Sequence, residues 1–79
     1  MEANGFKNRL CEAMKEGIFI KIIFQYPASD RATVKRGYVK NVYNSEFDLE
    51  EILDGLVTFS YKFIVEIMEE KKWPPYHIN

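Results

Sequence analysis

The sequence predicts a mainly β protein, in which one N-terminal helix is followed by a five-stranded, strongly bent antiparallel barrel. Three observations predict this class. Apolar residues recur at helical spacing only within residues 4–17, and from Ile18 onward they alternate as in a β-strand. Gly37 lies inside the longest β-rich run, where a glycine typically marks a bulge or a sharp bend. A bent barrel lets a short chain enclose a core with few open strand edges.

The predicted helix covers residues 4–17. Asn4 is the expected N-cap, and Gly17 is expected to end the helix in a left-handed conformation. A helix of about three turns is marginal alone in water, so it must lay its apolar face on the rest of the chain. That face is formed by four residues spaced by four, three and one: Phe6, Leu10, Ala13 and Met14.

The barrel is expected within residues 18–70. Its first strand runs from Ile18 to Phe24, with the helix as the expected cover. The second runs from Thr33 to Tyr43 and carries a bulge between Val39 and Val42, which are three rather than two positions apart.

A short third strand follows, with Phe47 and Leu49 pointing inward. A helical turn is expected at residues 50–53, and Asp54-Gly55 is a favoured hairpin signal. The last two strands are expected at residues 56–60 and 63–68, joined by a tight corner at residues 61–62. Residues 71–79, with the run Trp73-Pro74-Pro75-Tyr76, read as an extended or disordered tail.

Length and composition exclude several classes of protein. At 79 residues the chain is a single domain, and with 47% hydrophobic and 15% aromatic residues it is too apolar to stay disordered. The sequence has one cysteine, Cys11, and one histidine, His77, so neither an internal disulfide nor a zinc cluster is expected. The sequence has no nucleophile constellation and no glycine-rich phosphate loop. We therefore expect no enzyme, no cofactor and no metal.

The charge distribution along the first residues is not that of a secretory signal, because residues 1–17 carry charged side chains throughout. The best apolar run, Ile18 to Phe24, already contains Lys21 and is far shorter than the ~18–20 residues that cross a bilayer. The lone Cys11, expected to be an inert residue on the helix, fits a reducing compartment. The sequence thus predicts a soluble, cytoplasmic protein without a membrane partner.

Three segments carry a resemblance to known families: Leu10-Cys11-Glu12-Ala13-Met14-Lys15-Glu16-Gly17, Ile20-Lys21-Ile22-Ile23-Phe24-Gln25-Tyr26 and Val57-Thr58-Phe59-Ser60-Tyr61-Lys62-Phe63-Ile64. Over about residues 8–68 the order of elements resembles small Sm-like and SH3-like barrels. These segments look like the opening and the closing parts of WYL-type domains, and the layout is similar to that of small bacterial YolD-like proteins. The resemblance implies a non-enzymatic module that binds nucleic acid or a nucleotide-like ligand, in bacterial or phage regulation. The WYL tripeptide itself is absent, so no functional residue is transferred.

Charge is divided unevenly between the two halves of the chain. Residues 1–43 hold eight basic and four acidic side chains, whereas residues 44–79 hold three basic and eight acidic ones. A basic strip with interleaved aromatic rings can pair with phosphates and stack on unpaired bases, so we predict a site for single-stranded nucleic acid. The alternative is a solvated strand face whose lysines discourage edge pairing. The candidate residues are Arg31, Lys35, Arg36, Tyr38, Lys40 and Tyr43.

An acidic stretch follows this strip, and we expect it to be a solvated loop rather than a metal or acid/base site, because the EF-hand spacing is absent. Such a loop can also meet the basic strand of a neighbouring copy. Protein–protein interaction or self-assembly into a homo-oligomer is therefore an alternative function, and small-ligand sensing between helix and barrel is another. The stretch comprises Glu46, Asp48, Glu50, Glu51 and Asp54.

Overall fold

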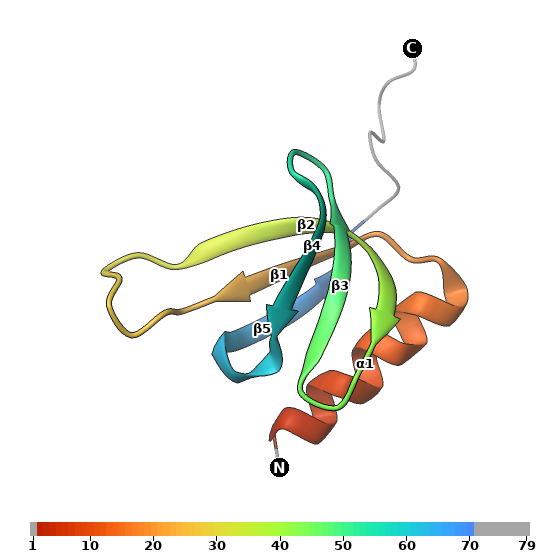
Figure 1. Cartoon of the computed structure of the whole chain (residues 1–79), viewed down its shortest axis with the longest axis horizontal. Coiled ribbons are helices and arrows are strands. Elements are labelled where there is room, and N and C mark those ends of the chain that lie inside the picture. Colours follow the sequence, from red (N-terminus) through yellow and green to blue (C-terminus); the bar gives the residue numbers. More distant parts are fainter. Residues whose placement is uncertain (1, 71–79) are drawn as a thin grey trace.

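One helix and five antiparallel strands make up residues 2–70, the part of the chain that the computed structural model describes, with side chains from residue 5 onward (Figure 1). The strands form one sheet in the order β4-β3-β2-β1-β5. The predicted mainly β class with a single helix is thus confirmed. In chain order the elements are α1 (Glu2–Glu16), β1 (Ile20–Phe24), β2 (Thr33–Val42), β3 (Glu46–Glu51), β4 (Gly55–Ser60), the short 3-10 helix η1 (Tyr61–Phe63) and β5 (Ile64–Glu69).

The sheet is bent but its hydrogen-bonded ladder is open. In Figure 1, β2 extends along β1 and then curves down beside α1, while the β3–β4 hairpin crosses in front of β1 and β5. Strands β4 and β5 are the two ends of the ladder, and no pairing joins them within residues 2–70. The antiparallel five-stranded sheet is confirmed, whereas a closed Sm/SH3-like barrel stays a prediction.

Gly37 marks a close approach of two strands, as the sequence predicts. A Cβ atom at this position would lie 2.0 Å from the backbone oxygen of Glu50, far inside van der Waals contact. Only glycine therefore lets β2 and β3 pair here. The predicted bulge is also present, because the register of β2 against β3 shifts between Val39 and Asn41.

The helix ends as predicted but begins earlier. Gly17 has a φ of 65°, and the N–H groups of Ile18 and Gly17 donate to the carbonyls of Ala13 and Met14 at 3.0 and 3.4 Å. These two bonds form a Schellman motif that satisfies the last helical carbonyls. The expected N-cap, Asn4, instead lies inside α1. An N-cap preference amounts to only about 1 kcal/mol, and here the helix continues beyond it.

The core lies between the helix and the inner face of the sheet. Leu10 and Ala13 of α1 join the predicted inward residues of β1 and β3 in one buried cluster. Phe19 lies on the opposite face of the sheet, where it is buried against the ring of Tyr38, with 5.2 Å between ring centroids. The inward residues of β1 and β3 are Ile20, Ile22, Phe24, Phe47 and Leu49.

The acidic stretch is not the solvated loop that the sequence predicts. Residues 46–51 form β3, which pairs with strands on both sides, and the predicted helical turn at 50–53 is replaced by a tight turn at 52–54. Burial of the Phe47 and Leu49 side chains in the core stabilises this strand more than the low β propensity of the neighbouring acidic residues destabilises it. The hairpin at Asp54-Gly55 is confirmed, with a φ of 80° at Gly55. The run at 73–76 lies outside the described residues.

Candidate interaction surface

The pleat of β2 divides the predicted nucleic-acid-binding residues between two faces. Arg36 and Tyr38 alternate on the outer face, away from the core, and Lys40, the unpaired residue of the bulge, reaches Glu50 on the same face. Lys35 lies on the inner face, since its register partner on β1 is the buried Ile22. Arg31 precedes the strand and Tyr43 follows it. The structure therefore brings three of the six predicted residues together.

Acidic side chains of the same chain already pair with most of the predicted cations. Lys35 Nζ lies 3.6 Å from Asp54 Oδ2, and Lys40 Nζ lies 3.4 Å from Glu50 Oε1. Arg36 Nε donates to Glu70 Oε1 at 3.3 Å. Within residues 2–70, Arg31 has no acidic partner inside 4 Å. The two oppositely charged halves of the sequence are thus neighbours in space, because β3 runs beside β2.

Asp48 is the centre of a polar network on the outer face. The residue is 7% exposed, and its carboxylate accepts hydrogen bonds from Thr58 Oγ1 at 2.6 Å, Tyr43 Oη at 2.9 Å and Asn41 Nδ2 at 3.0 Å. These bonds, that from Thr58 above all, hold the pKa of Asp48 below its ordinary value. The bond to Asp48 in turn raises the pKa of Tyr43. The three hydrogen bonds favour the ionised carboxylate and connect β2, β3 and β4 on this face.

Glu51 fixes the turn between β3 and β4. Its side chain is buried, and Oε1 accepts from the backbone N–H groups of Leu53 at 3.0 Å and Asp54 at 2.7 Å. A buried carboxylate is stabilised by such bonds to backbone donors, which also restrict the loop. The conformation of the turn is therefore set by a side chain of the chain itself.

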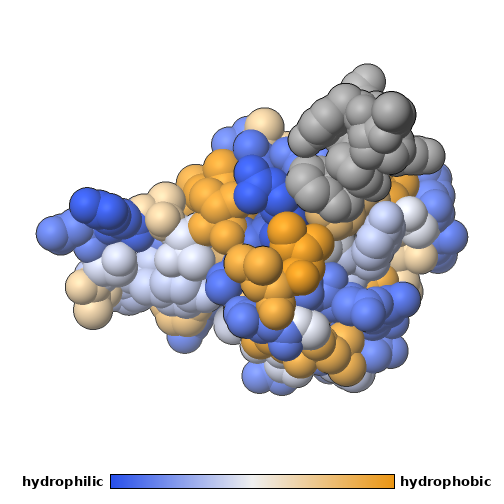
Figure 2. Space-filling model, turned by 90° about the horizontal axis from the view of Figure 1, so that it is seen from above, coloured by the Kyte–Doolittle hydropathy of each residue, from blue (hydrophilic) through white to orange (hydrophobic). Residues whose placement is uncertain are grey.

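Four exposed apolar residues gather at this end of the β3–β4 hairpin, and we call them the hairpin-end patch: Tyr38, Ile52, Leu53 and Leu56. Leu53 is 85% exposed and Leu56 61%. Tyr38, Glu50 and Leu56 are register neighbours across three strands. Figure 2 views the molecule from the side of this hairpin end, and apolar side chains lie near the centre of that face among charged ones.

An open hollow of about 390 Å³ lies within the patch, lined by Tyr38, Glu50, Glu51, Ile52 and Gly55. Sequence reasoning missed this surface, because residues 50–56 indicate only a turn and the start of a strand. The available signal was the placement of leucines and isoleucine around an Asp-Gly turn, where polar residues are usual.

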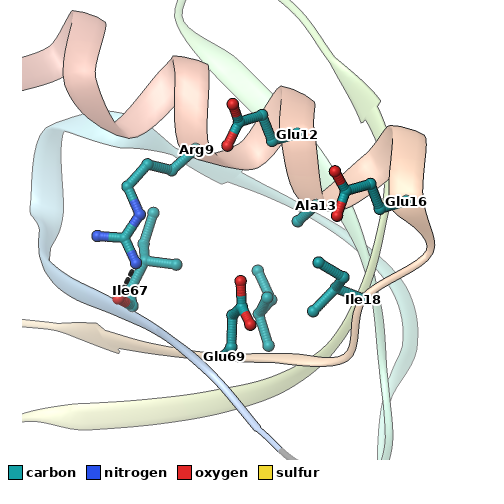
Figure 3. A pocket seen from close by; sticks show the side chains of 8 residues that line it. Arg9, Glu12, Ala13, Glu16, Ile18, Ile67 and Glu69 are labelled. Atoms are coloured by element: carbon teal, nitrogen blue, oxygen red, sulfur yellow. Dashed lines mark hydrogen bonds between the residues drawn. The ribbon is translucent and has the colours of Figure 1, made fainter.

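A second pocket lies between α1, β1 and β5 (Figure 3). This is where the sequence places small-ligand sensing as an alternative function. Its volume is about 50 Å³, well below the roughly 300–1,000 Å³ of ligand pockets. Arg9 spans its mouth, with Nη2 donating to the carbonyl of Ile67 at 2.6 Å. The pocket has room for a few water molecules.

The described residues also bear on metals and membranes. Within residues 2–70, no three histidine, cysteine or acidic side chains meet in an arrangement that suits a metal ion. No helix in the same residues is long and apolar enough to span a bilayer.

No protein family model, curated protein or solved structure matches this chain. The resemblance to WYL-type and YolD-like domains therefore stays a prediction, and function is inferred from the surface alone.

Proposed function

We propose that this chain is a non-catalytic protein-interaction module that binds its partner through the hairpin-end patch. The observation that carries the proposal is the exposure of Leu53, Leu56 and Ile52, at 85, 61 and 47%, on one hairpin end. Single exposed apolar residues are common on protein surfaces, but a contiguous group is typical of an interaction site. The predicted cationic strip is, by contrast, largely paired within the chain.

The turn that carries Leu53 supports the proposal. Glu51 holds two successive backbone N–H groups of this turn, so Leu53 is presented in a defined conformation. A surface that is ordered before binding loses less conformational entropy when a partner docks. The open hollow beside Tyr38 provides the concave part of the same surface.

Site-specific photo-crosslinking in the organism that encodes the chain tests this function. A photoreactive amino acid in place of Leu53 is expected to give one dominant protein adduct, which Leu56→Asp weakens. The matched control is the same amino acid in place of Val65, which is 56% exposed on β5. Equal adducts from both positions, or none from position 53, would contradict the proposal.

A second candidate function is binding of single-stranded nucleic acid by the outer face of β2. It is favoured by the alignment of Arg36, Tyr38 and Lys40 on one face, with Tyr38 41% exposed. The ion pair of Lys40 with Glu50 is exposed and that of Arg36 with Glu70 is partly exposed. Exposed pairs contribute only about 0–1 kcal/mol, so phosphates can compete for these cations.

Fluorescence anisotropy with labelled oligonucleotides at low salt tests this candidate. Arg36→Ala/Lys40→Ala is expected to abolish binding and Leu53→Glu to leave most of it. The logarithm of affinity should fall with log salt by about 0.7 for each phosphate contacted. An absence of binding at low salt, or equal binding by the double variant, would remove nucleic acid from consideration.

A further inference from the structure

We infer that the partner of the hairpin-end patch is another protein, which docks an extended, basic segment as an added strand on the open edge of β4. This inference rests on the proposed function, whose binding mode and partner chemistry it specifies, since Leu56 of the patch lies on β4. Strand addition requires free backbone groups, an unprotected edge and side chains that fit the added strand.

The backbone groups of β4 point alternately toward β3 and toward the open edge. The N–H of Tyr61 donates to the carbonyl of Ser45 at 3.3 Å, in continuation of the register, so the odd-numbered residues of β4 bond to β3. Leu56 and Thr58 therefore direct their N–H and C=O groups outward. Within residues 2–70 these backbone groups have no hydrogen-bond partner. An extended strand supplies donors and acceptors at the spacing that they require.

The other end of the sheet, β5, is protected by the chain itself. The N–H of Glu70 donates to Phe19 O at 3.0 Å, so the even-numbered residues of β5 face β1 and Ile67 directs its carbonyl outward. Arg9 Nη2 donates to this carbonyl at 2.6 Å. Strand β5 also carries two glutamates and an irregular register against β1, whereas β4 has no charged residue, no proline and a regular register. Charges, prolines, bulges and covering groups keep added strands off sheet edges, so β4 is the unprotected edge.

Side chains on the inner face of β4 favour apolar residues in the added strand. Val57 and Phe59 lie on that face and are only partly buried, although Phe59 stacks on Phe24 with 5.0 Å between the ring centroids. Apolar side chains beside them would extend the core past β4. Cross-strand pairs between aromatic and β-branched residues are stabilising, so valine or isoleucine suits these positions.

The outer face beside β4 carries an acid without a base. Glu46 is the register partner of Ser60, is exposed and has no basic group within 4 Å among residues 2–70. An added strand would lie two strand spacings from β3, about 9–10 Å. The long side chains of a lysine or arginine and of Glu46 together span this distance, because Ser60 between them is small.

The other acids near this edge are already bonded within the chain. Asp48 accepts three hydrogen bonds, and Glu50 pairs with Lys40 at 3.4 Å. Glu51 accepts two backbone N–H groups of the turn. A second copy of the chain offers no basic strand to Glu46, because β4 is uncharged and the charged residues of β5 are acidic. Charge complementarity therefore favours a strand from another protein.

Nuclear magnetic resonance titration of the full chain with a synthetic peptide tests the inference. The probe is Lys-Val-Lys-Val-Lys-Val-Lys with both termini blocked, which places valines on one face and lysines on the other. It is expected to bind and to slow amide hydrogen exchange at Leu56 and Thr58, whose N–H groups gain acceptors. The same peptide with glutamate in place of lysine is expected to bind at least about tenfold more weakly, because its charges oppose Glu46.

Two substitutions at Thr58 provide a matched pair. Both remove the hydrogen bond from Thr58 Oγ1 to Asp48, but only Thr58→Pro removes the outward N–H. Proline is tolerated on an edge strand where the N–H faces solvent, so both variants should fold, which circular dichroism checks. Thr58→Pro is expected to weaken peptide binding at least about tenfold, because an acceptor of the peptide loses its donor. Thr58→Val is expected to bind the peptide as the wild type does.

Three results would overturn the inference. One is an absence of peptide binding up to about 1 mM, and another is equal binding by Thr58→Pro and Thr58→Val. The third is slower exchange at Leu56 and Thr58 when the protein alone is concentrated, since a second copy would then occupy the edge. A crosslink from position 53 to another protein that Thr58→Pro leaves unchanged would uphold the proposed function without strand addition, so the two failures are distinguishable.

Discussion

Replacement of Gly37 by alanine is the most severe small perturbation that the structure suggests. The new methyl group would lie 2.0 Å from Glu50 O, 2.8 Å from Glu50 C and 3.0 Å from Glu51 Cα. All three are backbone atoms, so β2 and β3 must separate locally. The separation threatens the Gly37–Glu51 pair and the neighbouring bond from Ile52 N–H to Arg36 O at 3.0 Å.

The expected cost follows from these contacts. One or two weakened ladder bonds contribute about 1 kcal/mol each, and forced overpacking about 1–3 kcal/mol. Alanine also reduces the conformational freedom of the unfolded chain, which stabilises the folded state by about 0.4–1 kcal/mol. The net loss of about 1–5 kcal/mol is a large part of the roughly 4–12 kcal/mol that a domain of this length has.

Urea unfolding followed by far-UV circular dichroism measures this loss. With a slope of about 1 kcal/mol/M, the midpoint of Gly37→Ala should fall by about 1–5 M, or the variant should not fold. Gly5→Ala is the matched control, because its Cβ meets no atom within 4 Å and it lies in α1. That variant should gain about 0.5–1 kcal/mol. A midpoint for Gly37→Ala equal to that of the wild type would refute the close approach of β2 and β3.

Three further predictions concern the helix end, the outer-face network and the turn. Gly17→Ala should cost about 1 kcal/mol in urea unfolding because alanine resists a φ of 65°, and an unchanged midpoint would contradict the Schellman end. Asp48→Asn should lower the melting temperature at pH 7. Because the folded pKa of Asp48 lies below its ordinary value of 3.8, its contribution is present above that value and is lost as pH falls through the depressed pKa. The difference in melting temperature should therefore shrink toward pH 2, and a constant difference would exclude this linkage. Glu51→Ala should accelerate amide hydrogen exchange at Leu53 and Asp54, because their N–H groups lose their acceptor. Unchanged exchange rates would show that another interaction protects these N–H groups.

Local sequence patterns were sufficient to predict most of the fold. The end of α1 at Gly17, the bulge after Val39 and the hairpin at Gly55 each depend on a few adjacent residues, and all are present. The close contact at Gly37 is also present, and it was predictable because a glycine within a β-rich run usually marks the approach of another backbone. The predicted start of the helix was wrong, because the preference of Asn4 for the N-cap position stabilises less than the continuation of the helix to Glu2.

The candidate site required the tertiary structure. From the sequence, the polarised charge of the two halves predicted a free basic strip and a free acidic loop. The pairing of β2 with β3 instead places Lys40 against Glu50, and the hairpin places Asp54 against Lys35.

The sequence by itself determined which residues turn inward and where the chain bends, because periodicity and glycine act over a few residues. Only the tertiary structure decided which charges cancel and which leucines stay exposed. Strand register brings together residues that are far apart along the chain, and it places both the buried Asp48 and the exposed Leu56 on the outer face. The location of the proposed interaction surface is therefore decided by the register of β3 and by the turn that follows it.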